Sequence, residues 1–282
     1  MILLKRMEPV GDIHVKTWSM MESIVNYKKH ISMIKQNEIL VFQSIENLSE
    51  HLYELLRKKT VNSPEGRYVS IALSGGSTPK RIFNDISSRD EGGINWKKIR
   101  LFWVDERCVS PDDDESNFKM TQINLLENLD IPDENIFRIF GENDPKKEAI
   151  RYSQVLKENL PSENGLPGFD IVLLGIGEDG HTASIFPGNT SLFHSTKYCE
   201  AVTHPQSGQQ RITITGAVIN NADLIIFMVT GADKAKILER IVYDKRKTEL
   251  PATLVNPTNG NLLWLLDAGA ASFLGNHSNK FS

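Results

Sequence analysis

Residues 175–188, Gly-Ile-Gly-Glu-Asp-Gly-His-Thr-Ala-Ser-Ile-Phe-Pro-Gly, hold the clearest chemistry in the chain. A histidine is neutral for much of its population at pH 7 unless its surroundings shift it, so His181 can take a proton from water. Asp179 stands two residues earlier, where its carboxylate can orient the imidazole ring and stabilise the protonated form. His204 is a weaker candidate because it lacks a glycine-rich turn. We therefore predict that His181 is a general base and Asp179 its orienting neighbour.

A second segment, Ser-Gly-Gly-Ser-Thr-Pro at 74–79, is typical of a phosphate-binding turn before a helix. Gly75 and Gly76 allow unusual φ values and close approach of a ligand to the backbone. Ser77 or Thr78 can cap the helix, whose free N–H groups bind phosphate. A plain tight turn is the alternative interpretation. The segment lacks both the Gly-Lys-Ser/Thr ending of a Walker loop and the Gly-x-Gly-x-x-Gly pattern, so nucleotide binding is not indicated.

Charged residues leave the end of an apolar strand together at Asp105 and Arg107. Arg107 could bind a phosphate or polarise a carbonyl oxygen, while Asp105 could hold a sugar hydroxyl or orient Arg107. A surface ion pair is the alternative. The acidic run at 112–115 is more typical of a solvated loop than of a metal site.

Two further cations, Arg211 and Lys234, lie near the ends of predicted elements and could add positive charge at a phosphate. Taken singly, each is equally compatible with a solvated surface position. The residues leave open which of Arg107, Arg211 and Lys234 would contact the phosphate.

Apolar strands alternate with helices along the chain, and these elements must position the candidate residues. We expect strands at 38–42, 68–73, 99–104, 170–174, 224–229 and 262–266, and helices at 45–57, after Thr78-Pro79, at 117–126, at 231–242 and in a short alanine-rich segment after 266. This alternation predicts an α/β fold: a single Rossmann-like domain with a mostly parallel sheet covered by helices on both faces. Ligands of such sheets bind outside the carboxyl ends of the strands, where the candidate loops lie.

Bulk properties narrow the class of protein. The 282 residues have a net charge of −4, which favours neither a nucleic-acid partner nor a membrane surface. No stretch approaches the roughly 18–20 apolar residues of a membrane span, and the start of the chain lacks a signal-peptide core. Cys108 and Cys199 form no disulfide framework and no metal-type pair. The expected location is the cytoplasm.

The quoted segments together resemble the 6-phosphogluconolactonase family: 74–79, Asp-Glu-Arg at 105–107 with Ser-Asn at 116–117, and 175–187. Pro205, Arg-Ile-Thr at 211–213, and Gly231 with Lys234 also fit. The resemblance runs from about Glu38 to Phe273. It leaves residues 1–34 as an N-terminal extension, packed on the surface or disordered, and 35–282 as a lactonase domain.

The resemblance implies hydrolysis of 6-phosphogluconolactone to 6-phosphogluconate in the pentose phosphate pathway, with no cofactor and no metal. His181, Asp179 and Arg107 would be catalytic, His181 activating water and Arg107 holding the substrate or the developing oxyanion. Contacts to the sugar phosphate would come from Gly75, Gly76, Ser77, Thr78, Asp105, Asn117, Arg211 and Lys234.

Two alternative functions remain open. Glucosamine-6-phosphate deaminases resemble the chain in Asp-Gly-His, but a segment with Asn-Glu-Pro typically follows. Here that segment is Ser-Ile-Phe-Pro at 184–187, and the deaminases tend to have tyrosine where Arg107 stands. A non-catalytic sugar-phosphate sensor would usually bring a DNA-binding segment, and residues 1–34 show no convincing helix-turn-helix.

Overall fold

The computed structural model describes residues 14–17, 38–163, 165–243 and 249–274. The large sheet has eight strands: β1 (His14–Thr17), β2 (Glu38–Phe42), β3 (Val69–Leu73), β4 (Ile99–Trp103), β6 (Ile136–Phe137), β9 (Ile171–Leu174), β12 (Leu224–Val229) and β13 (Asn261–Asp267). Their order is β1-β2-β13-β12-β9-β3-β4-β6, and every pair is parallel.

After the edge strands β1 and β2, the chain builds the rest of the sheet outwards in two directions from its middle. From β3 it continues to β4 and β6 on one side, and from β9 it continues to β12 and β13 on the other. β3 and β9 are neighbours, so the order of the strands reverses between them. Such a switch point opens a crevice at the carboxyl ends of the two strands.

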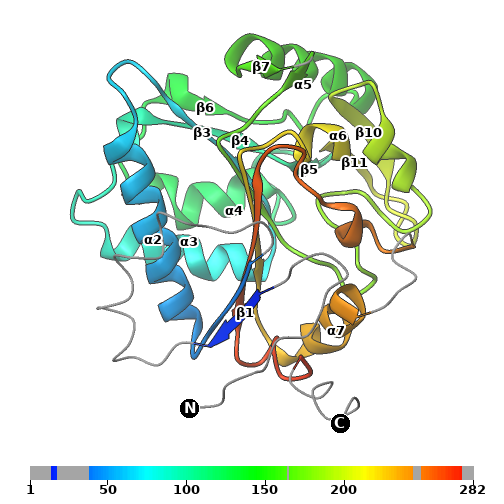
Figure 1. Cartoon of the computed structure of the whole chain (residues 1–282). Helices are drawn as coiled ribbons and strands as arrows, with labels where there is room; N and C mark the ends of the chain where they lie inside the picture. Colours follow the sequence, from blue (N-terminus) through cyan, green and yellow to red (C-terminus); the bar gives the residue numbers. More distant parts are fainter. Residues whose placement is uncertain (1–13, 18–37, 164, 244–248, 275–282) are drawn as a thin grey trace.

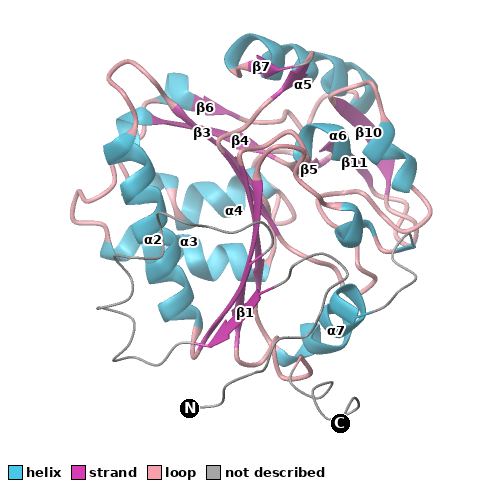
Figure 2. Ribbon diagram, in the orientation of Figure 1, coloured by secondary structure: helices cyan, strands magenta, loops and turns pink. Residues whose placement is uncertain are grey.

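Helices cover both faces of the sheet: α2 (Ile45–Asn62), α3 (Ser77–Arg89), α4 (Asn117–Asn124), α5 (Pro145–Asn159), α6 (Gly216–Ile219) and α7 (Ala235–Tyr243). Figure 1 shows α2 and α3 on one side of the sheet, and α6 and α7 on the other. A small antiparallel sheet of β5 (Asp105–Arg107), β10 (Cys199–Thr203) and β11 (Gln210–Ile214) lies beside α6 (Figure 2). β7 (Ser162–Glu163) and β8 (Leu166–Pro167) form a short hairpin. None of the described helices is long and apolar enough to cross a membrane.

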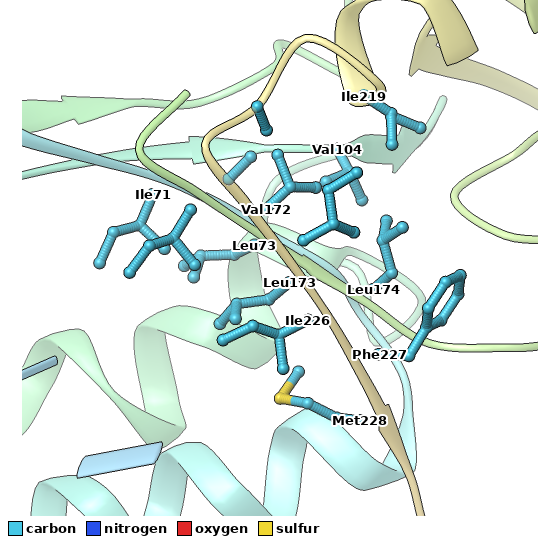
Figure 3. Packing of buried hydrophobic residues seen from close by; sticks show 14 of the residues in the cluster. Ile71, Leu73, Val104, Val172, Leu173, Leu174, Ile219, Ile226, Phe227 and Met228 are labelled. Atoms are coloured by element: carbon cyan, nitrogen blue, oxygen red, sulfur yellow. The ribbon is translucent and has the colours of Figure 1, made fainter. Parts of the chain in front are cut away.

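The central strands are apolar because both of their faces are covered. All six residues of β12 and all four of β9 are buried. Figure 3 shows Leu173, Ile226 and Phe227 in this core. The ring of Phe227 stacks on Trp264 of the neighbouring strand, with 3.9 Å between centroids. Burying each such side chain contributes about 1.5–3 kcal/mol, so the core holds the strand ends firmly beneath the loops.

The predicted α/β fold and the strands between 38 and 266 are confirmed. The helix predicted at 45–57 continues to Asn62, and the one predicted at 231–242 starts with a 3-10 turn, Ala232–Lys234, before α7. The expectation of a helix after residue 266 is wrong, because that segment consists of turns. There the backbone N–H groups of Ser272 and Leu274 bond to oxygens only three residues earlier, at 3.3 and 3.0 Å, so the bonding pattern of an α-helix does not continue.

Among the elements that were not predicted are α5 and the small sheet. α5 is mostly polar, yet Asp144 caps it and Pro145 follows, which is a usual signal of a helix start. The small sheet has no such signal, because Asp-Glu-Arg in β5 lacks an apolar alternation. Of residues 1–34, the structure describes only β1, which pairs with β2. The rest of the expected extension lies outside the described residues.

His51 on α2 makes stability sensitive to acid. Burial, with a smaller contribution from Lys58, lowers its pKa from 6.5 to about 4. As the pH falls from 6.5 to 4, the unfolded chain takes up a proton that the folded chain does not. The free energy of unfolding should therefore fall by up to about 3 kcal/mol over this window.

Urea unfolding at pH 7 and pH 4.5 measures this effect. His51→Gln should lose less stability on acidification than the wild type. His194→Gln replaces an exposed histidine and is the control. This variant should lose as much stability on acidification as the wild type. Equal losses in all three proteins would contradict the assignment.

Candidate active site

The switch point between β3 and β9 opens into a pocket of about 240 Å³. Its walls come from the loops after β3, β9 and β12 and from the small sheet. The lining residues are Ser74, Gly75, Gly76, Ser77, Thr78, Pro79, Asp105, Arg107, Asn117, Gly175, Ile176, Gly177, His181, Ala183, Arg211, Met228, Val229, Thr230 and Lys234. Every residue predicted for the site lines this pocket except Asp179, which contacts one that does.

His181 and Asp179 form a bonded pair in the loop after β9. The imidazole Nδ1 lies 2.6 Å from the Asp179 carboxylate, which also accepts the backbone N–H of His181 at 3.1 Å. Partial burial alone would raise the pKa of Asp179, but the hydrogen bonds from His181 outweigh it and the pKa is lowered. An ionised carboxylate only accepts, so Nδ1 is the donor, and in the neutral imidazole Nε2 then keeps its lone pair. This is the tautomer that a general base needs.

Glycine makes room for this ring. A Cβ atom at Gly177 would lie 2.1 Å from Nδ1 of His181 and 2.7 Å from the Asp179 carboxylate. On its other side, the imidazole packs against Phe186, with 5.0 Å between ring centroids. The glycine-rich turn therefore serves the placement of the histidine.

The loop after β3 approaches the pocket with its backbone. Gly76 has a φ of 108° and is the N-cap of α3. No side chain caps this helix. The expectation that Ser77 or Thr78 caps α3 is wrong, because both side chains line the pocket as first-turn residues. A Cβ atom at Gly75 would lie 1.7 Å from Oδ1 of Asn117, so only glycine fits there. The start of α3 thus presents free N–H groups, which favour an anion.

Hydroxyl groups and a lysine continue this wall. Thr78 Oγ1 lies 2.8 Å from Thr230 Oγ1, across the gap between α3 and β12. Ser74 is buried and its Oγ has no hydrogen-bond partner among the described residues. The Lys234 ammonium lies 3.8 Å from the Asp233 carboxylate, and its side chain is 21% exposed.

Two arginines lie opposite each other on the small sheet. Arg107 on β5 pairs in register with Arg211 on β11, so both side chains leave the same face of the sheet. Burial is the main cause that lowers the pKa of Arg211, and the positive charge of Arg107 also lowers it. In the described part of the chain neither arginine forms an ion pair; Arg107 bonds to the backbone oxygen of Glu115, and Arg211 Nε to Gln209 at 3.2 Å. Two such cations favour an anion between them.

Near the arginines, the buried carboxylate of Glu106 accepts backbone N–H groups of two segments. One oxygen of Glu106 accepts the N–H groups of Arg107 and Asn117, both at 2.8 Å. The other accepts from Phe118 N at 2.8 Å and Ser116 Oγ at 3.2 Å. Burial raises the pKa of Glu106 although three backbone donors act against it. Glu106 therefore ties the Arg107 strand to the start of α4.

Asp105 makes its contacts within the protein. Its carboxylate accepts from Ser184 Oγ at 2.5 Å and from Asn117 Nδ2 at 3.3 Å. The weaker base candidate, His204, does not line the pocket, and its Nδ1 accepts the N–H groups of Gln206 and Ser207. Burial and then the charge of Arg211 lower the pKa of His204.

Sequence reasoning did not single out Thr230, Ser74, Glu106 and Ser184. Thr230 directly follows the buried strand β12, so the rule of carboxyl ends would have found it. Glu106 and Ser184 lay inside quoted motifs, but their role is to contact other protein groups. Among the described residues there is no group of three or more His, Cys, Asp and Glu side chains that could hold a metal ion.

Comparisons with known proteins identify the family of the chain. A family model described as glucosamine-6-phosphate isomerases/6-phosphogluconolactonase matches residues 43–264. The 6-phosphogluconolactonase of Treponema pallidum is 47% identical over 174 residues, covering 62% of this chain and 72% of that protein. That of Nostoc is 37% identical over 251 residues, covering 88% of this chain and 99% of the relative.

Solved structures share the fold. A 6-phosphogluconolactonase from Trypanosoma brucei matches with a TM-score of 0.73 and 29% identity, covering 85% of this chain and 99% of that one. A monomeric glucosamine-6-phosphate deaminase matches with a TM-score of 0.70 at 21% identity, over 83% of this chain and 98% of that one, which shows the fold alone. The chain belongs to the glucosamine-6-phosphate isomerase/6-phosphogluconolactonase family.

Proposed function

We propose that this protein is a 6-phosphogluconolactonase that opens the lactone ring to give 6-phosphogluconate in the pentose phosphate pathway. The observation that carries the proposal is the His181–Asp179 pair, which faces a pocket with Arg107, Arg211 and Lys234 on its walls. The proteins named 6-phosphogluconolactonase that are 37–47% identical to the chain support it.

The reaction begins with a water molecule beside His181. As its oxygen attacks the lactone carbonyl carbon, Nε2 takes one of its protons and Asp179 stabilises the imidazolium that forms. Arg107 holds the negative charge that develops on the carbonyl oxygen. When the tetrahedral intermediate collapses, the bond to the ring oxygen breaks and the imidazolium returns the proton to that oxygen. The product is an acid with a free hydroxyl group, and His181 is neutral again.

The phosphate of the substrate would lie against the start of α3. There the free N–H groups after Gly76, the hydroxyl of Thr78 and the cations Lys234 and Arg211 supply donors and positive charge. Gly75, Ser77 and Asn117 complete this wall. Asp105 supports this wall through its contacts with Asn117.

The deaminase alternative is less compatible with the surroundings of the base. The deaminase-type segment carries a glutamate after Asp-Gly-His, whereas here the ring of Phe186 packs against His181. A carboxyl group is thus replaced by an apolar ring. Absence of nucleic-acid partners and a cytoplasmic location stay predictions.

Removing the base tests the proposal. His181→Ala should lower kcat for 6-phosphogluconolactone by about 10²-fold or more, because the variant lacks the group that takes the proton from water. The assay follows acid release and subtracts spontaneous ring opening. His194→Ala, at an exposed position, is the control. Near-wild-type turnover by His181→Ala would overturn the assignment, and ammonia release from glucosamine 6-phosphate would favour the deaminase.

Removing the phosphate cations separates binding from chemistry. Arg211→Gln and Lys234→Gln should each raise KM by about tenfold and change kcat less, because a charge-assisted bond to the phosphate is lost in ground state and transition state alike. Steady-state kinetics over a range of lactone concentrations measures both constants. An unchanged KM in both variants would exclude these cations from the phosphate site.

A further inference from the structure

A buried polar cluster lies behind the pocket wall, made of Asp105, Asn117, Ser184 and Thr213. These side chains are 5%, 2%, 0% and 0% exposed, respectively. We call it the buried junction. It joins three segments that are far apart in the sequence, and each segment also carries a residue of the pocket.

Ser184 has the central place in the buried junction. Its hydroxyl donates to Oδ2 of Asp105 at 2.5 Å, and its backbone N–H donates to Oγ1 of Thr213 at 3.3 Å. Asn117 approaches Asp105 from another side, donating to its backbone oxygen at 2.9 Å and to its carboxylate at 3.3 Å. Side chain and backbone of Ser184 are therefore both bound to the small sheet.

The register of the small sheet relates these contacts to the two arginines. Asp105 pairs with Thr213, and Arg107 pairs with Arg211. Residues two apart on a strand share a face, so the two partners of Ser184 and both arginines project from the same face. The arginines line the pocket, and the partners of Ser184 lie two residues away from them on the same two strands.

His181 stands three residues before Ser184 in the same loop. Its imidazole is fixed within that loop by Asp179 and Gly177, as described above. The loop is in turn attached through Ser184 to the face that carries Arg107. The contacts of Ser184 with Asp105 and Thr213 therefore connect the loop that carries the base to the sheet that carries Arg107.

We propose that Ser184 is a positioning residue for lactone hydrolysis, whose hydroxyl bond to Asp105 holds the His181 loop in register with Arg107. The inference rests on the proposed function. Displacing a catalytic group by as little as 1 Å can cost about 10²-fold in rate. The start of α3, Lys234 and Arg211, which are assigned to the phosphate, have no hydrogen bond with Ser184 among the described interactions, so KM should change little.

The chain offers a matched control for removing this hydrogen bond. Ser70 is 4% exposed and donates to the buried carboxylate of Asp170 at 3.0 Å, at the amino end of β3 and away from the pocket. Ser184→Ala and Ser70→Ala each remove a buried serine–aspartate bond, but only the first lies between His181 and Arg107. Steady-state kinetics and thermal unfolding of both variants separate positioning from general stability.

We expect Ser184→Ala to lower kcat about tenfold with KM within twofold of the wild type. Ser70→Ala should lower the melting temperature by a similar amount and keep kcat within twofold. A kcat within twofold in Ser184→Ala, a loss that falls on KM instead, or an equal loss of kcat in Ser70→Ala would each overturn the inference.

A second variant covers the case in which Ser184→Ala does not fold. Ser184→Cys replaces the hydroxyl with a somewhat larger thiol that is only a weak donor, and the same criteria apply to it. The wild-type protein separates the two levels of the argument. If it does not hydrolyse the lactone, the proposed function fails; if it does and the Ser184 variants keep kcat, only the positioning role fails.

Discussion

The whole site depends on one constraint, the parallel direction of the eight strands. Parallel strands have all their carboxyl ends at one edge, and the connections between them must cross over the faces of the sheet. The core is filled by β9, β12 and their neighbours, so the loops at that edge do not have to pack into it. The reversal of strand order between β3 and β9 leaves room there. Five segments that are distant in the sequence therefore meet around one small volume.

Charge is distributed unevenly in a protein whose net charge is −4. The acids nearest the pocket do not neutralise its arginines. Glu106 holds backbone N–H groups and Asp105 holds Ser184 and Asn117, so both stay beneath the surface. Arg107 and Arg211 remain available to a ligand and lie opposite each other, where an anion would relieve their repulsion. The architecture thus uses negative charge for structure and positive charge for binding.

The sequence was most informative where local chemistry determines structure. Apolar runs located the central strands, and the glycine-rich segment around His181 located the turn that receives its ring. Features that depend on distant partners were not accessible. β5 is a strand only because β11 pairs with it, and the roles of Ser184 and Glu106 become visible only beside Asp105 and α4. The missing side-chain cap of α3 has the same origin, because Thr78 bonds to Thr230, which follows a distant strand. Local signals were present for α5, in its capping residue and proline, and for Thr230, in its position directly after a buried strand.

The Thr78–Thr230 contact has a consequence for what a ligand meets at the pocket wall. Two hydroxyl groups carry two protons, and the bond between them uses one. The second proton is left to point away from the pair, so the two side chains together offer one free donor rather than two. This donor stands beside the free N–H groups at the start of α3, where an acceptor oxygen of an anion can bond to it.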